Sequence, residues 1–140
     1  MNPKACKEEI EKLAASLGLN IIVAAVVGDD LLEQFSDLQQ QGKIHPFGME
    51  GENDILPQDK VMLSCNAYFG ALPIKQALDQ GAHIVVTGRC VDSALVLGPL
   101  MHEYGWTSAD YDKLAAGSVA GHIIECGCQV RFAWYIDLLF

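Results

Sequence analysis

Residues 84–93 constrain the fold most, because they combine an apolar run, a tight turn and the start of a helix. The β-branched run over residues 84–86 is typical of a strand buried on both faces, which is the pattern of parallel sheets. The turn over residues 87–89 ends the run, and Asp92 and Ser93 can accept hydrogen bonds from the first N–H groups of a helix. Because ligands of open α/β sheets bind at the carboxyl ends of strands, this turn is the expected site.

Two further segments repeat this order of strand, turn and helix. Residues 21–27 form a continuous apolar run, and the acidic turn at residues 28–30 leads into a predicted helix from Leu31 to about Gln41. A third strand candidate, residues 61–64, precedes a helix over residues 72–80. Repeated units of this kind predict parallel strands with right-handed crossovers. The predicted fold class is therefore α/β, with an open, mostly parallel sheet that has helices on both faces and is incomplete at both ends.

The remaining segments are predicted mainly as helices. Asn2 followed by Pro3 is typical of a helix N-cap and first helical residue, and Gly18 ends that helix. Glycines and prolines predict a loop over residues 42–59, and loops of such length are often functional lids. The other predictions are a helix from Asp92 to about Tyr104 with a kink or break at Gly98-Pro99, a short helix over residues 110–114 and a helix over residues 118–126.

The composition excludes several classes of function. The chain has 140 residues, 51% hydrophobic and 19% charged, so we expect a globular domain with a core. A formal net charge of −9 argues against nucleic acid as a partner, because such binding needs clustered Lys and Arg. No apolar run approaches the roughly 20 residues of a membrane span, so no membrane is expected as a partner. Five cysteines without a secretory signal are typical of a cytoplasmic protein.

Familiar cofactor and nucleophile motifs are missing from the sequence. The patterns Gly-x-Gly-x-x-Gly, the P-loop and Gly-x-Ser-x-Gly are absent, which argues against a dinucleotide site, a nucleoside-triphosphate site and a hydrolase elbow. Cys126 and Cys128 place two sulfurs close together without a second pair at zinc spacing. We therefore interpret these cysteines as incidental thiols and predict neither a metal nor a cofactor.

Arg89 is the leading candidate for substrate binding, together with Thr87 and Gly88 of the same turn. A long cation that follows a buried strand must either pair with an acid or face a cleft. As an anion clamp, Arg89 would bind a carboxylate, a phosphate or a CoA-like group. The alternative is an ion pair with Asp92 or Asp29, and Asp92 itself is favoured as a helix cap over a catalytic acid.

Other polar residues also follow predicted strands. Asn66 and Tyr68, after the third strand candidate, could orient a polar substrate or satisfy backbone groups of an irregular turn. Asp29 and Asp30 could hold a metal or act as a base, although adjacent aspartates usually cap helices. Asn66, Tyr68 and Asp92 therefore join the turn at Arg89 as predicted substrate-binding residues.

His122 and Glu125 are the catalytic candidates. They lie three residues apart, so a helix places them on the same face. This spacing suits acid–base chemistry or a pair of metal ligands. The alternative is a hydrogen-bonded pair that holds the helix against the core.

Five stretches together resemble the acyclic terpene utilisation AtuA family, and residues 87–99 are the most specific of them. The likeness covers about residues 1–130. The stretches are Met1-Asn2-Pro3, Gly28-Asp29-Asp30-Leu31, residues 66–71, residues 87–99, and Ala120-Gly121-His122 with Glu125-Cys126-Gly127.

The resemblance implies a role in the bacterial breakdown of acyclic terpenes such as citronellol and geraniol, a pathway that proceeds through acyl-CoA thioesters. It assigns no reaction to individual residues. Our hypothesis is that the turn binds an anionic acyl substrate, either an acyl-CoA or a branched acid. Arg89 would clamp the anion, Asn66 and Tyr68 would orient the acyl group, and His122 with Glu125 would handle a proton. The alternative is a non-catalytic scaffold or interaction subunit of a catabolic assembly.

The resemblance also suggests how the chain is divided. Residues 1–130 look like the core α/β portion of such a domain, and residues 131–140 look like a divergent apolar tail. The whole therefore looks like an internal fragment of a longer domain. A sheet that lacks strands exposes apolar edges, so we predict weak solubility or self-association, with a homo-oligomer as one outcome.

Overall fold

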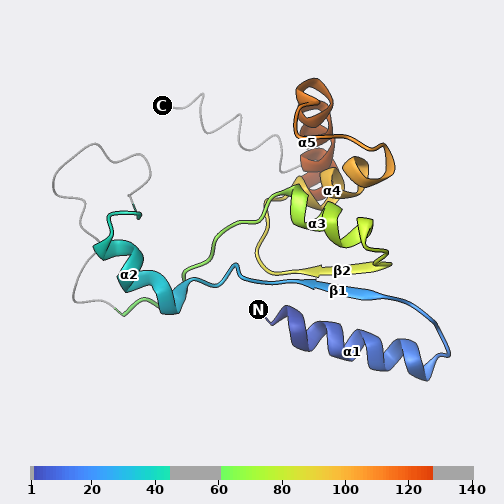
Figure 1. Cartoon of the computed structure of the whole chain (residues 1–140), viewed down its shortest axis with the longest axis horizontal. Helices are drawn as coiled ribbons and strands as arrows, with labels where there is room; N and C mark the ends of the chain where they lie inside the picture. The colour runs from blue at the N-terminus through green and yellow to red at the C-terminus, as the bar shows by residue number, and fades with distance from the viewer. Residues whose placement is uncertain (1, 45–60, 128–140) are drawn as a thin grey trace.

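The computed structural model describes residues 2–44 and 61–127. Its elements form a small α/β fold with one parallel pair of strands, as the sequence predicts (Figure 1). The elements in chain order are α1 (Pro3–Ser16), β1 (Val23–Val26), the 3₁₀ turn η1 (Leu32–Gln34), α2 (Phe35–Gln40), α3 (Ala71–Asp79), β2 (Ile84–Thr87), α4 (Ala94–Glu103) and α5 (Tyr111–Cys126). The predicted loop at residues 42–59 and the boundary at residue 130 lie largely or wholly outside the described residues.

The two strands lie between helices on both faces. β1 and β2 are parallel, with Val23 opposite Ile84 and Val26 opposite Thr87. α1 packs on one side of the pair and α3 on the other, with α4 and α5 stacked beyond α3 (Figure 1). The predicted α/β fold, an open parallel sheet with helices on both faces, is therefore confirmed.

The expected burial of the strands is wrong. Among the residues of β1 and β2, Val23 alone is buried, and Ile84 is 36% exposed. Each strand of a two-stranded sheet has a neighbouring strand on one edge alone. Its side chains therefore lack neighbours on the other edge and stay partly exposed. Ile22 and Val27, which flank β1, are 53% and 44% exposed. Self-association through such apolar surface stays a prediction.

The third strand candidate is also wrong. Residues 61–65 have no regular secondary structure, although Val61 and Leu63 are apolar. Their side chains are 84% and 86% exposed, so neither packs against a sheet. The chain then forms two isolated bridges, in which Asn66 pairs with Asp30 and Phe69 pairs with Cys90.

The helix termini follow the sequence signals in part. Asn2 caps α1, since its Oδ1 accepts a hydrogen bond from the Ala5 N–H at 3.1 Å. α4 begins after Ser93 without a side-chain cap, so the prediction that Asp92 caps this helix is wrong. α4 continues through Pro99, so there is no break at that residue.

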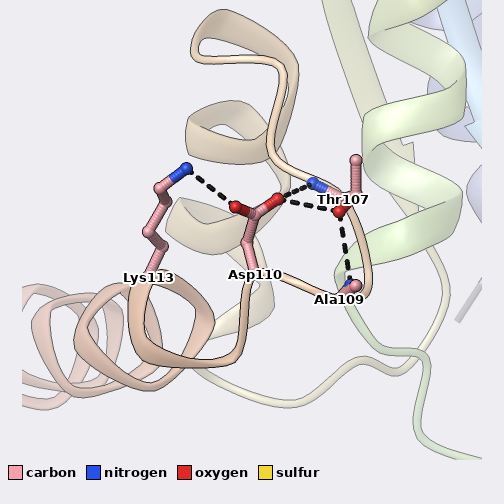
Figure 2. A network of polar contacts seen from close by, with 4 residues as sticks. All are labelled: Thr107, Ala109, Asp110 and Lys113. Atoms are coloured by element: carbon pink, nitrogen blue, oxygen red, sulfur yellow. Dashed lines mark hydrogen bonds and ion pairs between the residues drawn. The ribbon is translucent and has the colours of Figure 1, made fainter.

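The two helices predicted between residues 110 and 126 are one helix, α5. Asp110 precedes it and holds the turn before it: Oδ2 accepts bonds from the Thr107 N–H at 2.8 Å and hydroxyl at 2.7 Å (Figure 2). Lys113 donates to Oδ1 at 2.7 Å, and the Ala109 N–H donates to the Thr107 hydroxyl. Lys113 and then Thr107 hold the pKa of Asp110 well below its usual range.

Glycines allow the helical layers to approach closely. A Cβ on Gly98 of α4 would lie 2.7 Å from the Ile74 side chain of α3. A Cβ on Gly121 of α5 would lie 2.7 Å from the backbone oxygen of Ser93, and one on Gly117 would lie 2.8 Å from Leu97. The small-residue positions of α5 therefore fix this helix against the start of α4. Among the described residues, no helix has both the length and the apolar character needed to cross a membrane.

Candidate functional site

The carboxyl ends of both strands are joined by the segment at residues 65–69. The Ala67 N–H donates to the backbone oxygen of Asp29 at 2.7 Å, which links the segment to the end of β1. The Phe69 N–H donates to the backbone oxygen of Arg89 at 2.9 Å, and the Val91 N–H donates back to Phe69 at 2.9 Å, which links it to the end of β2. Polar residues from three separate parts of the sequence therefore meet at this edge.

The Asp29 carboxylate is the centre of this meeting point. Its side chain is buried, with 6% of the residue exposed. Oδ2 accepts a hydrogen bond from the Arg89 backbone N–H at 2.8 Å and another from the Asn66 side-chain amide at 3.0 Å. A Cβ on Gly88 would lie 1.9 Å from Oδ1 of this carboxylate, so only glycine leaves the space that Asp29 occupies.

The hydrogen bonds keep Asp29 ionised. The Arg89 N–H lowers the pKa of this carboxyl most, and its own backbone N–H and the Asn66 amide lower it further. Burial opposes them, because it disfavours the charged form, but the pKa remains below its ordinary value of 3.8. Asp29 therefore acts here as an ionised side chain that positions the turn rather than as a general base.

Arg89 packs its guanidinium on Tyr68. The guanidinium carbon lies 4.7 Å from the centre of the Tyr68 ring, and Nη2 donates to the Tyr68 hydroxyl at 2.8 Å. Both side chains are exposed. Across residues 2–44 and 61–127, this guanidinium forms no ion pair, so the predicted alternative of a pair with Asp29 or Asp92 is wrong.

The structure also places the remaining polar residues predicted near the turn at Arg89. Thr87 ends β2, and its hydroxyl donates to the Cys90 sulfur at 3.6 Å. Asp30 accepts a hydrogen bond from the Leu32 N–H at 3.0 Å, which forms a local turn before η1; the N-cap of η1 is Leu31, so Asp30 does not take the predicted helix-capping role. Asn66, Tyr68, Gly88 and Arg89 are thus linked through Asp29 and Arg89, and we refer to these four residues as the first cluster.

A second cluster forms where the turn after β2 meets the end of α5. Asp92 Oδ2 lies 3.8 Å from Nε2 of His122 and 3.3 Å from Sγ of Cys126. The Cys126 thiol also lies 2.7 Å from Oε2 of Glu125. Among the contacts of the described residues, His122 therefore faces Asp92, and Glu125 faces Cys126.

The carboxylates of the second cluster change the chemistry of its thiol. Glu125, burial and then Asp92 raise the pKa of Cys126 to about 12, because a thiolate beside two carboxylates is electrostatically unfavourable. Cys126 is thus protonated at neutral pH and donates its hydrogen to a carboxylate. The roles predicted for His122 and Glu125 in proton transfer stay predictions.

Cys126 is the residue of this cluster that the sequence interpretation missed. The sequence interpretation paired Cys126 with Cys128 and not with His122, which lies four residues earlier on the same helix. Helical spacing places residues i and i+4 on one face, so His122 and Cys126 were the signal available in the sequence. Their partner Asp92 required knowledge of how α5 packs on α4.

The comparisons with known proteins give one match. The model of the family described as “Acyclic terpene utilisation family protein AtuA” matches residues 1–138. No curated protein and no solved structure matches the chain. The matched range includes both clusters.

Proposed function

Because the chain belongs to the acyclic terpene utilisation AtuA family, we propose that its first cluster binds an anionic acyl compound, either a branched acid or its CoA ester. The observation that carries this proposal is the guanidinium of Arg89, which is exposed, stacked on Tyr68 and without an ion-pair partner in the described part of the chain. A guanidinium has five N–H donors, and the Tyr68 hydroxyl occupies one of them. The remaining donors suit a carboxylate or a phosphate.

The position of Arg89 is fixed before any ligand binds. Its backbone N–H is held by the buried Asp29 carboxylate, and its side chain rests against the Tyr68 ring. Less side-chain entropy is then lost when an anion binds, which favours affinity. The Asn66 amide donates to the same oxygen of the Asp29 carboxylate and so helps to hold that carboxylate in place.

An apolar hollow whose lining includes Gly70, in the segment that follows Tyr68, supports an acyl ligand. It has a volume of about 470 Å³ and begins at Gly70, two residues after Tyr68. Its walls include Leu72, Leu97 and Met101. Pockets for small apolar ligands have volumes of about 300–1,000 Å³ and few polar groups, so a branched acyl chain suits this space.

The test is a ligand-dependent thermal shift on the full chain. The panel contains a branched acyl-CoA, the matching free acid and CoA alone, which separates recognition of the carboxylate from recognition of the phosphates. We expect an anionic ligand to raise the melting temperature of the unmodified chain. Arg89→Ala should weaken its binding roughly 10- to 100-fold, the equivalent of about 1.5–3 kcal/mol for charged hydrogen bonds.

Lys12→Ala is the matched control, because Lys12 is an exposed cation on α1 paired with Glu9. This variant should bind as the unmodified chain does. Equal ligand-induced shifts in Arg89→Ala and Lys12→Ala, with circular dichroism showing both folded, would contradict the proposal.

A further inference from the structure

Asp92, His122 and Cys126 bring three different metal-ligand atoms together, and we refer to them as the D-H-C cluster. The carboxylate oxygen, imidazole nitrogen and thiol sulfur all lie within 4.8 Å of one another. Asp92 comes from the turn after β2, whereas His122 and Cys126 lie one helical turn apart on α5. Two elements distant in sequence therefore supply the set.

The spacing of these atoms suits one shared ion. With bonds of about 2.0–2.3 Å to N, O and S, tetrahedral zinc places its ligand atoms roughly 3.3–3.6 Å apart. The two distances from Asp92 Oδ2, 3.8 Å to His122 Nε2 and 3.3 Å to Cys126 Sγ, are close to that range. The third pair, the His122 imidazole nitrogen and the Cys126 sulfur, lies within 4.8 Å.

The charges around the cluster also favour a cation. The carboxylate of Glu125 lies 2.7 Å from the Cys126 sulfur, so two acids and a thiol share this corner. Within the described residues, neither Asp92 nor Glu125 forms an ion pair with a lysine or arginine. A bound divalent ion would compensate this negative charge.

The backbone around the cluster is fixed by close packing. Gly121, the neighbour of His122, lies so near the Ser93 backbone oxygen that a Cβ would approach it to 2.7 Å. Ser93 in turn follows Asp92. The contact between Gly121 and Ser93 therefore holds the two parts of the cluster at a set separation.

We propose that the D-H-C cluster binds a divalent metal ion of the zinc type through Asp92 Oδ2, His122 Nε2 and Cys126 Sγ, with the Cys126 thiol releasing its proton to solvent as the thiolate binds the ion. A set of one O, one N and one S donor favours zinc or cobalt over magnesium or calcium, which prefer oxygen ligands alone. The side chains of His122 and Asp92 are 46% and 50% exposed, so further coordination positions face solvent. This proposal does not depend on anion binding at Arg89.

The test is a titration of the full, reduced, metal-free chain with Co²⁺ followed by competition with Zn²⁺. We expect one Co²⁺ per chain, a thiolate-to-cobalt charge-transfer absorption, and loss of that absorption when Zn²⁺ is added. Cys126→Ser should abolish the charge-transfer absorption, and His122→Ala should weaken Co²⁺ binding at least 10-fold. Binding without the absorption, or no stoichiometric binding, would overturn the proposal.

Two cysteine variants make the assignment specific. Cys6→Ser is the matched control, since Cys6 is an exposed thiol on α1, and it should retain the full signal. Cys128→Ser should also retain it, because Cys128 is not one of the proposed ligands. If either of these variants loses the absorption while Cys126→Ser keeps it, the assignment is refuted. Circular dichroism on each variant separates loss of ligand from loss of fold.

Discussion

Replacement of Gly88 by alanine tests the arrangement at the strand ends most sharply. The added Cβ would lie 1.9 Å from Oδ1, 2.2 Å from Cγ and 2.6 Å from Oδ2 of Asp29, so the carboxylate must move. Movement breaks its hydrogen bonds with the Arg89 N–H and the Asn66 amide. Bonds to a charged group contribute about 1.5–3 kcal/mol each, and we expect a total loss of roughly 3 kcal/mol. That is a large share of the about 5–15 kcal/mol typical of a domain.

The assay is urea unfolding followed by circular dichroism, with a double-mutant cycle. In an Asp29→Ala background the three crowding atoms are gone, so Gly88→Ala should cost less than about 1 kcal/mol there. Gly70→Ala is the control, because a Cβ at Gly70 would meet nothing within 4 Å. The reasoning is refuted if Gly88→Ala leaves stability unchanged, or if its cost is the same with and without Asp29.

Two further predictions concern pH and helix packing. The pKa of Asp29 is lowered in the folded chain, so the stability that its carboxylate contributes is present above pH 3.8 and is lost as the pH falls below that value. The acid unfolding of Asp29→Asn should therefore depend less steeply on pH than that of the unmodified chain. Equal slopes for the two proteins would count against this role of Asp29. Gly121→Ala should reduce the free energy of unfolding by about 1–3 kcal/mol and also weaken Co²⁺ binding, because the added Cβ pushes α5 away from Ser93. Ala116→Gly, on the exposed side of α5, should lower stability by roughly 1 kcal/mol without changing metal affinity.

Apolar runs predicted the two real strands but not their burial. Residues 21–27 and 84–86 are continuous apolar segments, and β1 and β2 lie within or over them. The same pattern at residues 61–64 forms no strand. An apolar run shows that a segment is able to form a strand, whereas the presence of a neighbouring strand decides whether the segment forms one. That neighbour is a tertiary property that periodicity does not contain.

Caps were predictable where the interaction is local. Asn2 caps α1 as expected, because its partner Ala5 is three residues away. Asp92 does not cap α4, because the end of α5 brings a histidine and a thiol within 3.8 Å of its carboxylate. A competitor that lies thirty residues or so along the chain is not visible from the capping pattern alone.

The sequence predicted where the candidate site lies but not which contacts hold it together. The turn at Arg89 does lie at the carboxyl ends of the strands, and Asn66 and Tyr68 do reach it. The role of Asp29 as the shared acceptor required the bridges formed by residues 66–69, which no motif encodes. The sequence predicted Gly88 as part of the site turn. The structure adds why glycine is needed there, which is the space that the Asp29 carboxylate occupies.

The central claim is that one buried carboxylate joins the ends of both strands and positions Arg89. The most direct test is an NMR titration with acid that follows the Arg89 backbone N–H and the Asn66 side-chain amide. The account predicts that both signals shift together, with a single midpoint below 3.8, and that Asp29→Asn removes both shifts. Separate midpoints, a common midpoint at or above 3.8, or shifts that persist in Asp29→Asn would contradict it.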